Sequence, residues 1–114
     1  MQHDDRLYLG HMLEMARKAR LFVENHSRAD FEKDEVLRFA LRHLLQIIGE
    51  AAGRVSERER LANPQIPWNE IIGMRHRVVH DYLGIDEDIV WRTIVADLPD
   101  LIVALERLLQ DLGD

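Results

Sequence analysis

The chain has 114 residues, no cysteine, and 15 lysines and arginines against 21 acids, a net charge of −6. This length fits one domain with a single hydrophobic core, and the lack of cysteine excludes a disulfide framework and a zinc site built on thiolates. The acidic start lacks the signal-peptide pattern, and no apolar run approaches the ~20 residues of a membrane span, so we expect a cytoplasmic protein. The acidic total also argues against a general nucleic-acid coat protein.

In the first half of the chain, apolar residues recur at intervals of three and four, the spacing of an amphipathic helix. The first stripe predicts a helix over about residues 4–24, and the second predicts one over about 33–55. The stripes are Leu9, Met12, Ala16, Ala19 and Val23, and then Leu37, Leu41, Leu44, Ile48, Ala51 and Val55. The stretch 25–30, NHSRAD, contains residue types that favour helix caps over helix interiors, so we expect it to connect the two helices.

Capping and helix-breaking residues mark the next elements. Ser56 and Glu59 fit a capping box that starts a short helical turn. Pro67 suits the first turn of a third helix, which would carry the sequence WNEIIGMRHRVVH. The following DYLGID predicts a turn, with Asp86 as the cap of the next helix.

One apolar phase then continues to the C-terminus. Its members are Trp91, Ile94, Leu98, Leu101, Leu105, Leu108 and Leu112. Because the helical spacing of these apolar residues continues past Pro99, it predicts one long helix with a kink near the proline. Residues 1–114 are therefore expected to form a single all-α domain, a small antiparallel up-and-down bundle of about four or five helices.

An arginine interrupts the apolar face of the third predicted helix. At about 100° per residue, one face collects Trp68, Ile71, Ile72, Val78, Val79 and Tyr82. Arg75 falls near the middle of this face. Burial of an unpaired guanidinium is very costly, so Arg75 needs an acid, a wet cleft or a ligand anion. A purely structural explanation is an ion pair with Glu50, with His80 placed at a helix C-terminus by the macrodipole.

Arg75 and His80 point in different directions on a regular helix. Five residues correspond to a rotation of about 140° between them. The two side chains can therefore meet only if the helix loosens at its C-terminal end, or if a second subunit supplies one of them.

The charge of the chain is unevenly distributed. Residues 54–77 hold five arginines and three glutamates, a balance of +2, whereas residues 81–114 hold nine acids and two arginines, a balance of −7. Planar guanidinium groups suit bidentate contact with phosphate. The alternative for the basic stretch is an ordinary solvated surface.

The segment GMRHRVVHDY has the form R-x-x-x-x-H-x-Y, with Arg75, His80 and Tyr82 at the defining positions. It resembles the HEPN superfamily and, within it, the HepT-like toxins. The similarity extends over about residues 4–105. It includes, in the family's order, the segments HMLEMARKA, SRADFEKDE, IIGEAA, PQIPWNEIIGMR, GID and IVWRTIVADLPDL.

The resemblance implies an all-α homodimer that cuts RNA without a metal or other cofactor, as the toxin of a toxin–antitoxin pair. Arg75 would bind the scissile phosphate, and His80 would assist proton transfer as the neighbouring 2′-hydroxyl attacks phosphorus. His76 would be a supporting polar group, together with Arg77, and Glu50 could orient Arg75. Transfer RNA and messenger RNA are both open as substrates.

Three further positions bear on the control or the strength of this activity. In the HepT-like family, the residue that matches Tyr82 accepts AMP from the partner, an MNT-type nucleotidyltransferase antitoxin. Many relatives have a glycine where this chain has Asp81, whose carboxylate could repel RNA. Gly84 in the predicted turn would help to expose the tyrosine ring.

Three alternatives stay open. His76 and His80 lie four residues apart and, with Asp81, could bind a metal. The chain could also be a non-catalytic HEPN module that binds a nucleotide or a partner, or a purely structural bundle. Cleavage of RNA in the presence of a chelator would exclude the metal site, and a lack of cleavage would favour the binding module.

Overall fold

The computed structural model describes the backbone of residues 3–80 and 87–113, and the side chains of residues 4–74 and 87–112. The helical elements are α1 (His3–Val23), α2 (Arg28–Lys33), α3 (Glu35–Arg54), α4 (Glu57–Ala62), α5 (Trp68–His80), α6 (Glu87–Arg92), the π-helical segment η1 (Thr93–Asp97) and α7 (Leu98–Gly113). Every secondary-structure element within these ranges is helical, which confirms the predicted fold class. No described helix has the length and apolarity that a membrane span requires.

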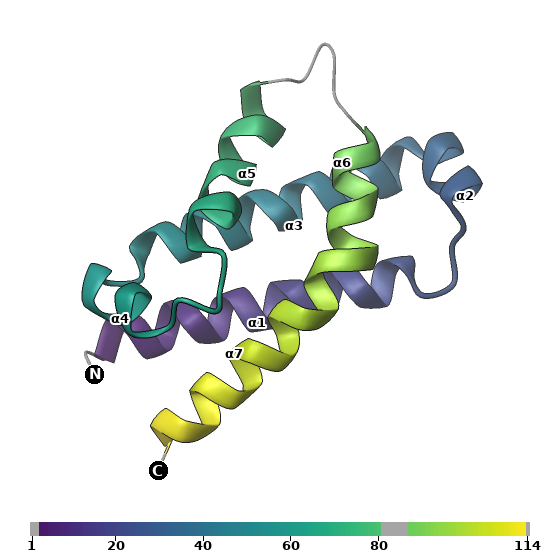
Figure 1. Ribbon diagram of the computed structural model, residues 1–114. Helices are drawn as coiled ribbons and strands as arrows, with labels where there is room; N and C mark the ends of the chain where they lie inside the picture. The colour runs from purple at the N-terminus through teal and green to yellow at the C-terminus, as the bar shows by residue number, and fades with distance from the viewer. Residues whose placement is uncertain (1–2, 81–86, 114) are drawn as a thin grey trace.

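Helices α1 and α3 run antiparallel at the centre of the fold (Figure 1). Helix α7 packs along α1, and α5 packs on α3. In Figure 1, α5 and α6 rise on the same side of α3, and α7 returns towards the N-terminal end of α1. Short helices α2 and α4 precede α3 and α5 respectively.

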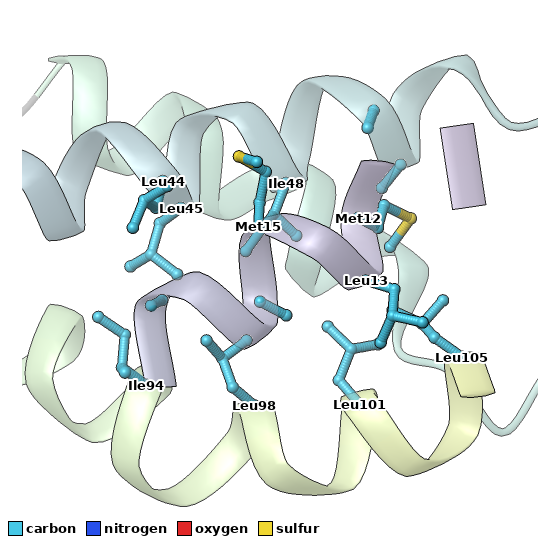
Figure 2. Close-up of a cluster of buried hydrophobic side chains, with 14 of the residues drawn as sticks. Met12, Leu13, Met15, Leu44, Leu45, Ile48, Ile94, Leu98, Leu101 and Leu105 are labelled. Carbon is cyan, nitrogen blue, oxygen red and sulfur yellow. The ribbon is translucent and has the colours of Figure 1, made fainter. Parts of the chain in front are cut away.

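The core lies between α1, α3 and the C-terminal helical segment. Figure 2 shows Met12, Leu13 and Met15 of α1 between two other layers, formed by Leu44, Leu45 and Ile48 and by Ile94, Leu98, Leu101 and Leu105. All members of the two N-terminal apolar stripes are buried, as is the C-terminal stripe from Ile94 to Leu108. The helical periodicity therefore predicted the core-facing sides of these helices correctly.

The connection between the first two long helices is more structured than its sequence suggested. Residues 28–33 form α2, so the expectation of a plain linker at 25–30 was wrong. Ser27 and Asp30 form a reciprocal capping box: Asp30 N–H donates to Ser27 Oγ at 3.1 Å, and Ser27 N–H donates to the Asp30 carboxylate at 2.8 Å. This backbone donor holds the pKa of Asp30 below its usual range. The buried Phe31 then anchors α2, with its ring 5.2 Å from that of Trp91.

The predicted starts of α4 and α5 are confirmed within a residue. Glu59 N–H donates to Ser56 Oγ at 3.2 Å at the start of α4. Pro67 directly precedes α5, and its carbonyl accepts a hydrogen bond from Ile71 N–H at 3.1 Å. Trp68 is buried and donates through Nε1 to the Asn63 carbonyl at 3.0 Å, so it anchors α5 to the body of the protein.

The C-terminal segment is one continuous helix whose irregular region is a π-helix just before Pro99. Leu98 N–H donates to the Thr93 carbonyl, five residues back, where an α-helix would use Ile94. Pro99 has no N–H, so it cannot donate to Ile94 in turn. Arg20 of α1 supplies the missing hydrogen-bond donor, because its Nη1 donates to the Ile94 carbonyl at 3.2 Å. The helix is thus irregular next to Pro99, as expected. The spacing of the apolar residues did not predict that the irregular segment is a π-helix.

Candidate RNA-cleavage site

The C-terminal half of α5 carries four of the residues singled out from the sequence. Arg75, His76, Arg77 and His80 all belong to this helix, and their side chains fall outside the described part. Tyr82 falls outside the described residues altogether, as do Asp81, Gly84 and Asp86 of the predicted turn. The structure therefore places the catalytic candidates on one helix, and it leaves their contacts and the proposed metal site at His76, His80 and Asp81 untested.

The N-terminal half of α5 is firmly attached to the bundle. Trp68 is buried, and Ile71, Ile72 and Met74 are partly buried against the core. Met74 directly precedes Arg75, so the described packing of α5 extends to the residue before the motif. This arrangement holds the motif backbone on a rigid support, as sites built on regular elements generally require.

Arg75 and His80 are fixed relative to each other by the helix that carries both. Helix α5 is α-helical through His80, so the two residues lie about 140° apart around the axis and about 7.5 Å apart along it. Loosening of the helix before His80, one of the two ways in which they could converge, is not seen. The other way, a second subunit that supplies one of the two residues, stays a prediction.

Glu50 lies on α3, the helix on which α5 packs. Its side chain is half-buried, and Oε1 accepts a hydrogen bond from Gln46 Nε2 at 3.3 Å. The carboxylate is thus held in a defined position by its own helix. Its contact with Arg75 stays a prediction.

A cavity of about 300 Å³ opens between the N-terminal half of α5 and the segment η1–α7. Its apolar wall includes Ile48 and Leu101, and three exposed carboxylates stand around it: Glu70, Asp97 and Asp100. Among the side chains that the structure describes, those that line it include no lysine, arginine or histidine. The sequence analysis did not predict this cavity.

The arginines of residues 54–77 do not form a single cluster in space. Arg54 ends α3, with its guanidinium 5.9 Å from the centre of the Tyr8 ring, and Arg58 and Arg60 lie on α4. Helix α4 is located near the N-terminal end of α5 (Figure 1), whereas Arg75 and Arg77 lie in the other half of α5.

The two tryptophans and three histidines outside the motif occupy positions that suit ordinary structural roles. Trp68 and Trp91 pack against neighbours, as expected for core anchors. His11 and His43 are exposed, and the exposed His26 places Nδ1 2.8 Å from the Phe22 carbonyl. These contacts give no reason to assign these histidines to a catalytic site.

The chain matches known proteins along almost its full length. Residues 12–108 match the family model described as Ribonuclease HepT-like. A protein named Putative RNase from Caldanaerobacter subterraneus subsp. tengcongensis is 37% identical over 105 residues, which cover 92% of this chain and 94% of the relative. A protein named Probable ribonuclease HepT from Thermococcus cleftensis is 32% identical over 95% of this chain and 98% of its own length. A Putative RNase from Methanocaldococcus jannaschii is 28% identical, with coverage of 97% and 92%. No solved structure matches the chain.

Proposed function

The chain belongs to the ribonuclease HepT-like family, and we propose that it is a metal-independent RNA endonuclease, the toxin of a toxin–antitoxin pair. The observation that carries the proposal is the Arg75, His80 and Tyr82 motif within a chain that matches the family over residues 12–108. The position of Arg75 and His80 on α5, directly after the buried anchor of that helix, supports it.

The chemistry needs few groups because RNA supplies its own nucleophile. The 2′-hydroxyl next to the scissile phosphate attacks phosphorus, the bond to the 5′-oxygen breaks, and the proton lost by the 2′-oxygen is balanced by one gained at the 5′-oxygen. Arg75 binds the phosphate and stabilises the charge that develops on it. His80 transfers protons at near-neutral pH. The products are a 2′,3′-cyclic phosphate and a 5′-hydroxyl.

Three residues support the two catalytic groups. Glu50 orients Arg75 from the neighbouring helix α3. His76 and Arg77 add polar and cationic groups beside the phosphate. A positive site of this kind can attract RNA even to a protein of net negative charge, because local potential governs the approach of a charged ligand.

The active unit is a homodimer. Arg75 and His80 diverge on one helix, and a two-fold axis can bring Arg75 of one subunit towards His80 of the other. The two motif helices then border a common cleft that holds two copies of each residue.

A partner nucleotidyltransferase of the MNT type neutralises the toxin by transferring AMP from ATP to the Tyr82 hydroxyl, with release of pyrophosphate and the phenol proton. The attached nucleotide places a bulky base and an anionic phosphate near Arg75. It thereby occupies the phosphate site and repels the RNA backbone. The Tyr82 hydroxyl is chemically suited to this role, since it forms a stable ester with the phosphate of AMP.

Incubation of the purified protein with total cellular RNA in excess EDTA tests the proposed activity. Cleavage that persists under EDTA and leaves cyclic phosphate ends supports the proposal, and sequencing of the fragments identifies transfer RNA or messenger RNA as the target. A preparation of the Arg75→Ala, His80→Ala double variant controls for contaminating nucleases. If no RNA is cut, a non-catalytic binding module becomes the better explanation, and cleavage abolished by EDTA would instead indicate a metal site.

A further inference from the structure

A groove runs between α5 and the C-terminal helical segment, and the cavity of about 300 Å³ lies within it. Helix α5 packs mainly on α3 (Figure 1), which leaves the space between α5 and η1–α7 open. Ile71, Met74 and Ala104 are only half-buried there, so the groove presents apolar surface to solvent. Concave apolar surface of this kind is the usual form of a binding site. The apolar lining comes from three helices and includes Leu45, Ile48, Ile71, Met74, Leu101 and Ala104.

The groove extends beyond this cavity. A second hollow adjoins the first, with which it shares Glu70, Met74 and Asp97, and it reaches Ile89 of α6. Along the C-terminal segment the two hollows together extend from Ile89 to Ala104, which is about 20 Å at 1.5 Å per residue. This length corresponds to about four turns of a helix. The groove therefore fits a segment of polypeptide better than it fits a compact small molecule.

Three carboxylates border this groove without a basic partner among the described residues. Glu70, Asp97 and Asp100 are exposed, and none of them makes an ion pair or a hydrogen bond with another residue that the structure describes. By contrast, the acids at the start of α6 are paired with arginines of α2 and α3. Among the described residues that line the two hollows, Arg92 is the only cation, so three acids against one arginine leave a balance of −2. The groove is therefore complementary to an apolar ligand that carries positive charge.

We propose that this groove binds a basic, amphipathic segment of a partner protein. An aliphatic side chain of the segment fills the cavity against Ile48 and Leu101. Lysine or arginine side chains beside it pair with Glu70 on one wall and with Asp97 and Asp100 on the other. Apolar contact at the centre and charged contact at the rim are the usual anatomy of a protein interface. This contact goes beyond the cleavage of RNA and does not depend on the nuclease assignment.

A labelled peptide with leucines and lysines at helical spacing is the probe, and fluorescence anisotropy with the full chain measures its binding. A scrambled peptide, and one with glutamate in place of lysine, should bind about tenfold more weakly or worse. Neutralisation of the three groove carboxylates should weaken binding by about tenfold, and this variant is Glu70→Gln, Asp97→Asn, Asp100→Asn. The matched control makes the same change of net charge at exposed positions in the region of α1 and should bind as the parent does, and it is Asp4→Asn, Glu14→Gln, Glu24→Gln.

Ala104→Leu tests the cavity without a change of charge. The larger side chain occupies part of the space that the aliphatic anchor needs, so binding should weaken by about tenfold. Methyl NMR of the parent locates the contact. The signal of Met74, which lines both hollows, should shift when the peptide is added, whereas the signals of Met12 and Met15, buried in the core, should not.

Circular dichroism confirms that each variant is folded. Equal binding of the scrambled peptide, or equal losses in the two triple variants, would indicate general charge attraction and overturn the proposal. A lack of binding at millimolar peptide would do the same. A Met74 signal that shifts with protein concentration alone would show that a second copy of the chain occupies the groove, which also contradicts the proposed partner. Because no RNA is used, these results are separate from any failure of the nuclease assignment.

Discussion

Asp5 of α1 binds Ser56, the residue that caps α4, through two hydrogen bonds. Ser56 N–H donates to Asp5 Oδ1 and Ser56 Oγ donates to Asp5 Oδ2, both at 2.7 Å across 51 positions of sequence. Asp5 is 3% exposed. The carboxylate therefore fixes the N-terminal end of α4 and, with it, the start of the segment that leads into α5.

Replacement of Asp5 should destabilise the fold. In Asp5→Ala, the backbone N–H of Ser56 loses its acceptor in a largely buried place, which should lower the free energy of unfolding by about 1–3 kcal/mol. Urea denaturation followed by circular dichroism measures the change. Asp4→Ala, at the neighbouring exposed position, should stay within about 0.5 kcal/mol of the parent. Equal effects of the two variants would contradict a specific role for the Asp5 carboxylate.

Loss of either catalytic candidate should abolish RNA cleavage while the helical fold persists. Arg75→Ala removes the phosphate-binding cation and His80→Ala the proton-transfer group, and each should reduce the rate by about 100-fold or more. Arg75→Ala should not lower stability, and it should raise it if the guanidinium is partly buried. Cleavage in EDTA, toxicity on overexpression and circular dichroism are the measurements.

Arg107→Ala provides the control for loss of a positive charge, because this arginine is exposed on α7, far along the sequence from the motif. It should cut RNA as the parent does. Parental activity in both Arg75→Ala and His80→Ala would exclude the catalytic assignment, and unfolding of Arg75→Ala would identify the residue as a structural ion-pair partner.

Mixed dimers should recover part of the lost activity if the site is shared between subunits. When Arg75→Ala and His80→Ala proteins are unfolded together and refolded, the heterodimer holds one intact Arg75 and one intact His80 on different chains. Activity above that of either variant alone then reports a composite cleft. No recovery in a verified heterodimer would place both residues of each site in the same chain, and a protein that is monomeric at micromolar concentration would rule out the dimer.

Tyr82→Phe should separate RNA cleavage from its control. The phenol is not needed by the phosphate chemistry, so cleavage should be largely unchanged, but the variant should no longer accept AMP and should stay toxic beside the antitoxin. Intact-mass analysis after incubation with the partner transferase and ATP measures the modification. Tyr8→Phe, the change at the other tyrosine of the chain, should be modified as the parent is. Equal AMP addition to wild type and Tyr82→Phe would leave Tyr82 with a packing role.

Apolar periodicity predicted the fold because burial of one helix face dominates where helices are long. Short-range polar contacts were harder to foresee. Ser27 and Asp30 are residue types that end helices as well as begin them, so their sequence did not reveal that they cap the new helix α2. The contact of Asp5 could not be foreseen either, because its partner Ser56 lies 51 positions away. Side-chain contacts over such separations depend on tertiary structure, which no local pattern contains.

The sequence proposed the residues of the candidate site, and the structure tests only part of their geometry. The motif spacing placed Arg75 and His80 on one helix, which α5 confirms as far as His80. The acidic cavity between α5 and η1–α7 depends on residues from three helical elements, such as Ile71, Thr93 and Leu101, that are brought together only by the fold. The motif alone therefore does not reveal this cavity.

The hydrogen bond from Arg20 to the Ile94 carbonyl has a consequence for cooperativity. An ordinary helix satisfies its interior carbonyls by itself, whereas this one depends on a side chain from α1, 74 positions earlier. Separation of the C-terminal helix from α1 would expose a buried apolar face and would remove the Arg20 donor from the Ile94 carbonyl. The two segments should therefore open together, with similar amide hydrogen-exchange rates in α1 and around η1, so that the first and last helices of the chain behave as one unfolding unit.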